Sequence, residues 1–269
     1  MHYNVLNERY EYGLKKRNLS RRSYVWNISR GHEEMFDSQL GIIPSLDVDI
    51  KEALEIVEKI KDLKHEIAGL KIGSILAWKY GLIKVVEDLR ETCDFPIMFD
   101  AQKAGTDIPD IVKEQVNLVA DANIDSFIAS PLGAGSATLE AFTKACFERD
   151  VIPIVVIEMT HPHFDAFLSE DASEKVLKQS LDLGVENFVA PANKPDRLKL
   201  YKNIAREMNS NIKIFSPGVG PQGGGPDSAV RAGTNFVIVG RSIYQAENPR
   251  DEVTRVYRLM KNAFMKTSS

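Results

Sequence analysis

The sequence predicts an α/β protein built as a (β/α)8 barrel, the TIM-barrel fold, with an N-terminal helical extension. Three observations lead to this prediction. From residue 42 onward, short runs rich in isoleucine and valine alternate with longer segments of helical periodicity. The apolar runs lack polar alternation, which is typical of parallel strands that are covered on both faces. Eight strand–helix pairs follow one another, and eight such units close a barrel.

Each strand is expected at a short apolar run, and each helix where apolar residues recur every three to four positions. The expected strands are residues 42–48, 68–76, 96–101, 126–131, 153–160, 187–192, 213–219 and 236–240. The expected helices are residues 50–66, 78–92, 108–122, 136–149, 173–183, 195–208, 227–231 and 249–264. A doubly wound open sheet is the alternative, but it needs no eighth strand, and no Gly-x-Gly-x-x-Gly motif follows the first strand. We therefore expect one catalytic barrel domain over residues 41–269.

Residues 1–40 differ from the rest of the chain because they contain a basic run at residues 14–22 with several aromatic residues nearby. One interpretation is an arm that binds RNA. The other is one or two helices packed on the outside of the barrel, with the basic face in water and the aromatic side chains as anchors. We favour the packed helices, so nucleic acid is not an expected partner.

Composition narrows the class of protein. The chain has 269 residues, of which 43% are hydrophobic, and a formal net charge of −4, which gives no general attraction to nucleic acid or anionic membranes. Cys93 and Cys146 lack the spacing of a metal site, which favours reduced thiols. No apolar run approaches the roughly 18 residues of a membrane helix, and the N-terminus lacks the apolar core of a secretory signal. We expect a cytoplasmic protein with no membrane partner.

Charged residues gather at the predicted carboxyl ends of the strands, where barrel enzymes place their active sites. Asp47 ends the first strand, Lys71 lies on the second, and Asp100, Lys103 and Asp107 surround the end of the third. A solvated loop between strand and helix is the plain alternative. Because buried charges are costly unless they are paired, a row of acids and lysines at a strand end favours a functional site.

Two further segments predict a phosphate site. Residues 216–225 form a glycine-rich loop after the seventh strand, and Arg241 follows the eighth. Glycines let backbone N–H groups approach an anion, and arginine adds a two-pronged donor. The alternative is a flexible turn beside a surface arginine. Loops after strands seven and eight commonly bind phosphate in this fold, which favours the phosphate site.

These segments together resemble orotidine 5′-phosphate decarboxylase of the archaeal and bacterial single-function type. The resemblance runs from about residue 42 to residue 250, and the motifs come in the order of that family. Its most specific parts are the loop around Gln222 and the run from Gly240 to Tyr244. The matching segments are Ser45-Leu46-Asp47, Leu70-Lys71-Ile72-Gly73, residues 100–109, Met159-Thr160-His161-Pro162, residues 216–224 and residues 239–244.

The resemblance implies a lyase that converts orotidine 5′-phosphate to UMP, the last step of pyrimidine biosynthesis, without cofactor or metal. It implies a catalytic array of alternating charge, formed by Lys71, Asp100, Lys103 and Asp107, with Lys103 as the proton donor. Asp107 would be shared across a homodimer. Asp47 and Lys71 would hold the ribose, and Thr160 would contact the pyrimidine. The residues implied at the phosphate are Pro217, Gln222, Gly240 and Arg241.

The chain departs from the family pattern around Lys103. Two residues, not one, separate Asp100 from Lys103, and three, not two, separate Lys103 from Asp107. Residues three apart on a regular strand face opposite sides, so Asp100 and Lys103 converge only if the chain bulges or leaves the strand. Gly105 is expected to supply a second irregularity. Ile111 stands where the family commonly has a threonine that reaches the ribose across the dimer.

Two other functions remain open. A relative that decarboxylates or condenses a sugar phosphate with Mg²⁺ would carry a glutamate on the second strand, where this chain has Lys71. A non-catalytic nucleotide-binding barrel would explain the altered spacing around Lys103.

Three other polar residues follow the fifth predicted strand or lie on it. His161 and His163 have no adjacent ligand set, so we expect them to have a structural role in the loop rather than to bind a metal. Glu158 is expected to point into the barrel.

Overall fold

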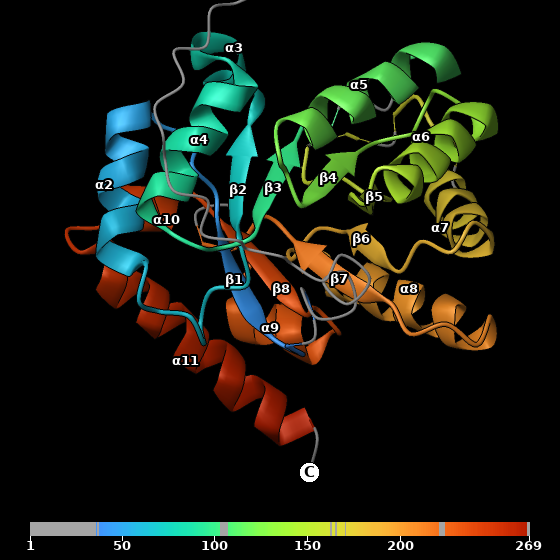
Figure 1. Ribbon diagram of the computed structural model, residues 1–269. Helices are drawn as coiled ribbons and strands as arrows, with labels where there is room; N and C mark the ends of the chain where they lie inside the picture. The colour runs from blue at the N-terminus through green and yellow to red at the C-terminus, as the bar shows by residue number, and fades with distance from the viewer. Residues whose placement is uncertain are drawn as a thin grey trace, which may run out of the picture.

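The computed structural model describes residues 36, 38–102, 107–161, 163–164, 166–169, 171–220 and 224–267. Parallel strands surround a common interior and helices cover their outer face, which is the expected (β/α)8 barrel (Figure 1). The strands are β1 (Gly41–Pro44), β2 (Leu70–Gly73), β3 (Ile97–Asp100), β4 (Ser126–Ala129), β5 (Ile152–Val156), β6 (Asn187–Val189), β7 (Lys213–Ser216) and β8 (Phe236–Val239). The helices are α2 (Ile50–Ile60), α3 (Ser74–Tyr80), α4 (Leu82–Thr92), α5 (Pro109–Asp121), α6 (Ser136–Glu148), α7 (Ala172–Asp182), α8 (Pro195–Glu207), α9 (Pro226–Arg231), α10 (Arg241–Tyr244) and α11 (Pro249–Thr267).

The sheet is nearly closed. Its strands pair in the order β1-β8-β7-β6-β5-β4-β3-β2, and each pair is parallel. Isolated bridges join β1 to the β2 side of the seam, between Ile42 and Ile67 and between Ser45 and Lys71. The N–H of Leu46 donates to the carbonyl of Lys71 at 2.9 Å. The seam therefore brings the end of β1 beside Lys71.

Several boundaries differ from the predicted ones. The fifth strand ends at Val156 rather than at residue 160. The predicted helix 50–66 ends at Ile60, because the chain must return to the seam, where Ile42 N–H donates to the Glu66 carbonyl at 2.8 Å. The predicted helix 78–92 is divided at Gly81, whose φ of +83° interrupts the helical backbone. The short helix α10 was not expected. Apolar periodicity locates elements well and places their ends poorly.

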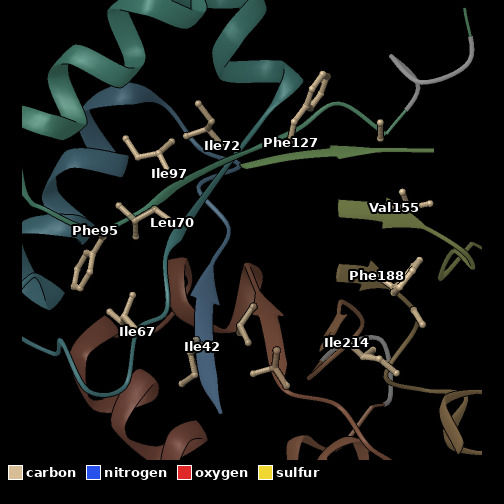
Figure 2. Packing of buried hydrophobic residues seen from close by; sticks show 14 of the residues in the cluster. Ile42, Ile67, Leu70, Ile72, Phe95, Ile97, Phe127, Val155, Phe188 and Ile214 are labelled. Atoms are coloured by element: carbon tan, nitrogen blue, oxygen red, sulfur yellow. The ribbon is translucent and has the colours of Figure 1, made fainter. Parts of the chain in front are cut away.

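Side chains alternate across each strand and fill two cores. The outer core lies between the strands and the helices; Figure 2 shows Leu70, Ile97 and Phe127 among its members. The inner core fills the barrel and includes Ile43 and Met98. Each fully buried side chain of this size contributes about 1.5–3 kcal/mol through removal of apolar surface from water. The two cores explain why the strands read as unbroken apolar runs.

The amino-terminal end of the barrel is closed by aromatic residues. Phe36 is buried, with its ring 5.0 Å from that of Phe215 and 5.3 Å from that of Phe236. Phe215 and Phe236 are themselves stacked at 4.7 Å. The interior is therefore apolar at this end, while the charged residues of the interior lie toward the carboxyl ends of the strands.

None of the helices in the described part of the chain combines the length and apolar character needed to cross a membrane.

Candidate active site

A cavity of about 230 Å³ opens at the carboxyl ends of the strands. Its walls are formed by the ends of β1, β2, β3, β7 and β8 and by the loop after β5. Of the residues predicted for the site, the structure places these on the cavity wall: Asp47, Lys71, Asp100, Thr160, Pro217, Gly240 and Arg241. Segments that are far apart in the sequence therefore meet in one site.

Lys71 is the central cation of this cavity. It faces the barrel interior because its neighbours Leu70 and Ile72 face the outer core. Its Nζ atom lies 3.0 Å from Oδ2 of Asp100 and 3.6 Å from Oδ1 of Asp47. We call Ser45, Asp47, Lys71 and Asp100 the Lys71 cluster. The ammonium group of Lys71 therefore connects β2 with β3 and with the segment that follows β1.

The charge on Lys71 is maintained by its neighbours. Burial alone would lower the pKa of this lysine, because the charged form loses its water. The carboxylates of Asp100 and then Asp47 outweigh burial, and they raise the pKa of Lys71 above its ordinary value. The side chain therefore remains an ammonium ion inside the cavity.

Asp100 is only partly satisfied. One oxygen, Oδ2, contacts Lys71, while the buried Oδ1 atom has no hydrogen-bond partner among the residues that the structure describes. Buried carboxylate oxygens are normally hydrogen-bonded, so an open one at a cavity wall is a position for a further donor.

Ser45, which the sequence did not predict as a site residue, fixes the side chain of Asp47. The Ser45 hydroxyl donates to Oδ2 of Asp47 at 2.5 Å. Gly73 leaves the space that Asp47 needs, because a Cβ atom on Gly73 would lie 2.6 Å from Oδ1 of Asp47. The Ser-x-Asp spacing at a strand end was the available signal, since residues two apart share a face of a strand. Gln102 and Tyr244 also line the cavity without having been predicted.

The loop after β7 is built for close approach of its backbone. Gly218 and Gly220 have φ values of +91° and +86°, which side chains rarely tolerate. Gly220 N–H donates to the Gly224 carbonyl at 3.0 Å, and Gly224 N–H donates to the Gly218 carbonyl at 3.0 Å. These two hydrogen bonds hold the two ends of the loop close together. Gln222 lies outside the described residues.

Arg241 begins α10 directly after β8. Its side chain is exposed and forms no ion pair with a carboxylate of the described chain. Gly240 precedes it, and its carbonyl accepts from Ile243 N–H at 2.8 Å and from Tyr244 N–H at 3.1 Å. A guanidinium at the cavity wall without a carboxylate partner in the described chain suits an anion such as phosphate.

The end of the third strand meets the geometric requirement set by the altered spacing. β3 ends at Asp100, and the chain then turns, with the Gln102 carbonyl accepting from Ser130 N–H at 2.9 Å. The chain thus leaves the strand before Lys103, as predicted. Lys103 and Gly105 fall in residues 103–106, outside the described chain, so the position of the amine and the second irregularity stay predictions.

Asp107 is not part of the cavity of its own chain. It is exposed, its Oδ1 atom accepts from Ile108 N–H at 2.8 Å, and its carbonyl accepts from the Thr138 hydroxyl at 2.8 Å. The structure therefore keeps Asp107 apart from the Lys71 cluster within one subunit.

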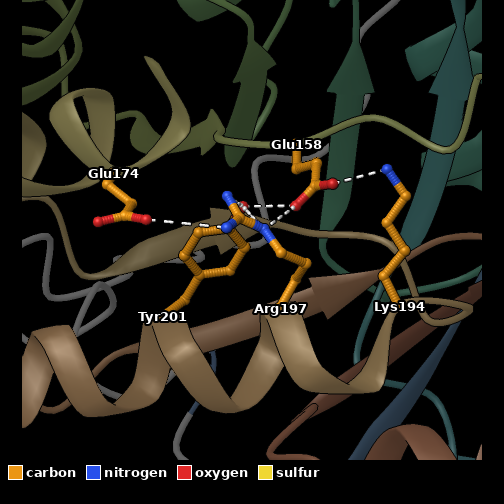
Figure 3. A network of polar contacts seen from close by, with 5 residues as sticks. All are labelled: Glu158, Glu174, Lys194, Arg197 and Tyr201. Carbon is orange, nitrogen blue, oxygen red and sulfur yellow. Dashed lines mark hydrogen bonds and ion pairs between the residues drawn. The ribbon is translucent and has the colours of Figure 1, made fainter. Parts of the chain in front are cut away.

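Glu158 faces α8 instead of the barrel interior, which corrects the expectation for this residue (Figure 3). Its Oε1 atom accepts from Lys194 at 2.6 Å, and its Oε2 atom accepts from Arg197 Nε at 3.1 Å and from the Tyr201 hydroxyl at 2.5 Å. Glu174 lies 3.7 Å from Arg197. We call these five residues the Glu158 cluster.

The Glu158 cluster holds the chain two residues before Thr160. Burial would raise the pKa of Glu158, but the hydrogen bonds from Lys194, Tyr201 and Arg197 lower it below its ordinary value. Burial, with Glu158 beside it, raises the pKa of Tyr201. The carboxylate therefore stays ionised and joins the end of β5 to α8.

The described residues contain no group of three or more histidine, cysteine or acidic side chains arranged to hold a metal ion. At the cavity itself, an ammonium group occupies the position on β2 where a cation site would need an oxygen donor. The donor set therefore suits an anionic ligand better than a divalent cation.

Comparison with known proteins gives one consistent family. The model of the Orotidine 5′-phosphate decarboxylase / HUMPS family matches residues 41–256. Curated relatives named orotidine 5′-phosphate decarboxylase include one from Methanosarcina acetivorans, 36% identical over 80% of this chain and 92% of the relative, and one from Thermococcus kodakarensis, 33% identical over 80% and 94%.

Solved structures show the same likeness. The orotidine 5′-monophosphate decarboxylase of Methanocaldococcus jannaschii, complexed with the inhibitor BMP, superposes with a TM-score of 0.73 and 29% identity, covering 82% of this chain and 98% of that one. The enzyme of Pyrococcus horikoshii gives a TM-score of 0.71 and 28% identity, covering 82% and 99%.

Proposed function

The chain belongs to the Orotidine 5′-phosphate decarboxylase / HUMPS family, and we propose that it converts orotidine 5′-phosphate to UMP and CO2 without metal or cofactor. The observation that carries this proposal is the Lys71 cluster at the cavity wall, where Nζ of Lys71 lies 3.0 Å from Asp100. An ammonium ion held between carboxylates suits a reaction in which a carboxylate leaves and negative charge develops on a ring carbon.

The chemistry follows from the charges. Breaking the bond between the pyrimidine ring and its carboxylate releases CO2 and leaves an electron pair on the ring carbon. A nearby ammonium group stabilises that pair and donates the proton that replaces the carboxylate. We assign this proton to Lys103, beside Asp100 in the sequence, on the family resemblance alone. A carboxylate next to the departing group would also disfavour the bound substrate, a contribution that is contested.

The remaining predicted residues divide by position. Asp47 and Lys71, near the seam, are proposed to hold the ribose, and Thr160 the pyrimidine. The proposed phosphate contacts are Pro217, Gly240 and Arg241, which follow β7 and β8, together with Gln222, which lies outside the described residues. Binding energy from a phosphate remote from the reacting bond can be used to orient the substrate and exclude water.

We further propose a homodimer in which Asp107 of the partner subunit completes the array. Asp107 is exposed and outside its own cavity, as this role requires. Large apolar side chains near the carboxyl ends of β2 and β3 are exposed, among them Trp78 at 82%, Ile75 at 59% and Ile108 at 62%. Apolar surface of this kind is typical of a subunit interface.

Turnover tests the proposal directly. Purified protein is mixed with orotidine 5′-phosphate in the presence of EDTA, and the loss of pyrimidine absorbance is followed. We expect full activity in the chelator. Activity that disappears with EDTA and returns with Mg²⁺ would favour the metal-dependent sugar-phosphate alternative.

Lys103 has its own test against the non-catalytic alternative. Lys103→Ala should abolish turnover while UMP still binds, because the proton donor is lost and the phosphate contacts remain. Retained turnover would remove Lys103 from this role.

The shared site is tested by mixing two inactive variants. Lys71→Ala and Asp107→Ala homodimers, once subunits exchange, should regain up to about a quarter of wild-type activity, because one of the two sites in a mixed dimer then carries neither substitution. No recovery despite proven exchange would argue against a shared site.

A further inference from the structure

A second cavity, of about 350 Å³, lies at the opposite end of the barrel from the Lys71 cluster. Its lining residues Gln39, Ile212 and Asn235 come shortly before β1, β7 and β8 begin, which places it at the amino-terminal face. Side chains of α8, α9 and the end of α11 complete its wall. Cavities of roughly 300–1,000 Å³ are the usual size for small-molecule ligands.

The charge in this cavity has one sign. Its lining includes Lys199, Lys202, Arg206 and Arg231, and none of the described lining residues is acidic. Two of these cations already have partners outside the lining: Arg231 lies 2.6 Å from Asp227, and Lys199 lies 3.5 Å from Asp196.

The other two cations have no carboxylate partner among the residues that the structure describes. Lys202 and Arg206 form no ion pair with any carboxylate of the described chain, and the hydrogen bond of Arg206 goes to the neutral amide of Asn203, at 2.9 Å. They are one turn apart on α8, so they face the same side of the helix. Within the described part of the chain, the cavity therefore holds two neighbouring positive charges that no carboxylate neutralises.

Lys202 is held in a fixed position. Its Nζ atom donates to the Ile212 carbonyl at 2.5 Å and to Oδ1 of Asn235 at 3.0 Å. Asn235 is itself fixed, because its Oδ1 atom also accepts from Ile214 N–H at 3.0 Å. An ammonium group has three donors, so one N–H of Lys202 is left for a ligand.

Burial beside a second positive charge lowers the pKa of Lys202. Burial, and then the positive charge of Arg206, lowers the pKa of Lys202 to about 8. Among the described residues, the charged side chains that line the cavity beside Lys202 are Lys199, Arg206 and Arg231. An anion placed here would relieve the repulsion between Lys202 and Arg206.

We propose that this cavity binds a small anion bearing a phosphate group, with the phosphate between Lys202 and Arg206. The site lies on the face opposite the mouth of the barrel, so it is distinct from the phosphate contacts proposed around Arg241. It does not depend on the proposed decarboxylation.

Calorimetric titration with inorganic phosphate tests the site. We expect two binding events in the wild type, one of them lost in Arg241→Ala and the other weakened at least about tenfold in Lys202→Met and in Arg206→Gln. Lys199→Met, which removes a cation already paired with Asp196, is the matched control and should keep both events. If Arg241→Ala removes all phosphate binding, or if Lys202→Met and Arg206→Gln leave both events intact, the proposal is wrong.

Folding is controlled within the same set. Arg206 is exposed, and its side chain bonds only to Asn203 in the described chain, so Arg206→Gln should remain folded even if loss of the Lys202 hydrogen bonds unfolds Lys202→Met. Turnover of orotidine 5′-phosphate should be unchanged in Arg206→Gln, since the two cavities are on opposite faces.

A second readout separates binding from a structural role of the lysine. In the Arg241→Ala background, phosphate binding is followed from pH 7 to pH 10, because burial lowers the pKa of Lys202 to about 8 and bound phosphate should draw a proton onto the lysine as it loses its own. The binding enthalpy should then vary with the ionisation enthalpy of the buffer, and this dependence should vanish when Lys202→Met is added. Binding without proton uptake at any pH in this range would contradict the assignment to Lys202.

Discussion

Two clusters of buried charge lie near the carboxyl ends of the strands, and they differ in how completely their polar atoms are used. In the Glu158 cluster both carboxylate oxygens of Glu158 are bonded, and three side chains donate to them. In the Lys71 cluster, Oδ1 of Asp100 is buried without a described partner, and the side chain of Asp47 is 43% exposed. Among the described residues, one cluster is closed and the other keeps a carboxylate oxygen available for a further donor.

The difference separates structure from function. A saturated network stabilises the fold because each charge is paired and each donor is used. A network with open positions is costly by itself, and it becomes favourable when a ligand supplies the missing partners. Buried charge is therefore a weak indicator of an active site, whereas buried charge with unused hydrogen-bonding capacity is a better one.

The largest expected effect comes from replacing the charged side chains of Lys71 and Asp100 with neutral ones. Lys71→Met combined with Asp100→Asn should lower kcat/KM for orotidine 5′-phosphate by about 10³-fold or more, since it removes the preorganised charges. The free energy of unfolding, measured in urea, should stay the same or rise by about 1–2 kcal/mol, because a buried ion pair is replaced by neutral groups. A loss of stability like that expected below for Glu158 would show that the Lys71 cluster is structural.

The closed cluster should respond in the opposite way. Glu158→Gln should lower the free energy of unfolding by about 3 kcal/mol, because Lys194 and Arg197 lose the charge that they surround. Turnover at low temperature should persist. Glu174→Gln is the matched control: this side chain is 30% exposed and lies 3.7 Å from Arg197, so its loss should cost less than about 1 kcal/mol. Equal losses in the two variants would remove the distinction between a closed network and a peripheral ion pair.

A smaller effect should follow from one methyl group beside Asp47. Gly73 has a φ of −98°, so alanine is allowed there, but its Cβ atom would lie 2.6 Å from Oδ1 of Asp47 and displace that carboxylate. Gly73→Ala should raise KM about tenfold, since a displaced side chain no longer holds its part of the substrate. An unchanged KM, with the protein still folded, would argue that Asp47 does not contact the substrate.

The smallest effects are expected in the pH dependence of stability, where Glu158 and Lys71 should lose their contributions at opposite ends of the pH range. The pKa of Glu158 is lowered in the folded protein, so its contribution to stability is full above its ordinary pKa of 4.5 and is lost as the pH falls below it. The pKa of Lys71 is raised, so its contribution is full below 10.5 and is lost only above that value. Urea unfolding of wild type and Glu158→Gln should therefore converge as the pH falls from 6 to 3. Curves that stay parallel over this range would mean that Glu158 is not ionised.

Much of the molecule could be predicted from the sequence because strand periodicity and strand-end charges are local signals. Lys71 stood out as a single charge within an apolar run, and the structure brings it beside Asp47 and Asp100. The partners of Glu158 could not be found in this way. They lie 36 to 43 residues further along the chain, on α8 and directly before it, and their helical pattern also fits a solvated face. Their role depends on the placement of α8 beside the segment that follows β5, which no local pattern encodes.

The helix ends were missed for a similar reason. The predicted helix 50–66 is stopped by pairing of residues 66–68 with β1, which is a requirement of barrel closure and not of local sequence. The division at Gly81 was visible as a glycine, but a single glycine inside an apolar pattern is often tolerated in a helix. Tertiary requirements decide such boundaries.

The three packed aromatic rings at the amino-terminal end of the barrel have a practical consequence for where the chain can be shortened. Similarity to the family starts at residue 41, yet Phe36, only 3% exposed, packs on Phe215 and Phe236. A protein trimmed at residue 41 would keep every strand and every described residue that lines the active-site cavity, but it would lose the Phe36 ring that covers the amino-terminal end of the barrel. The sequence similarity to the family therefore begins inside the folding unit. A shortened protein that is to keep its stability should start before Phe36.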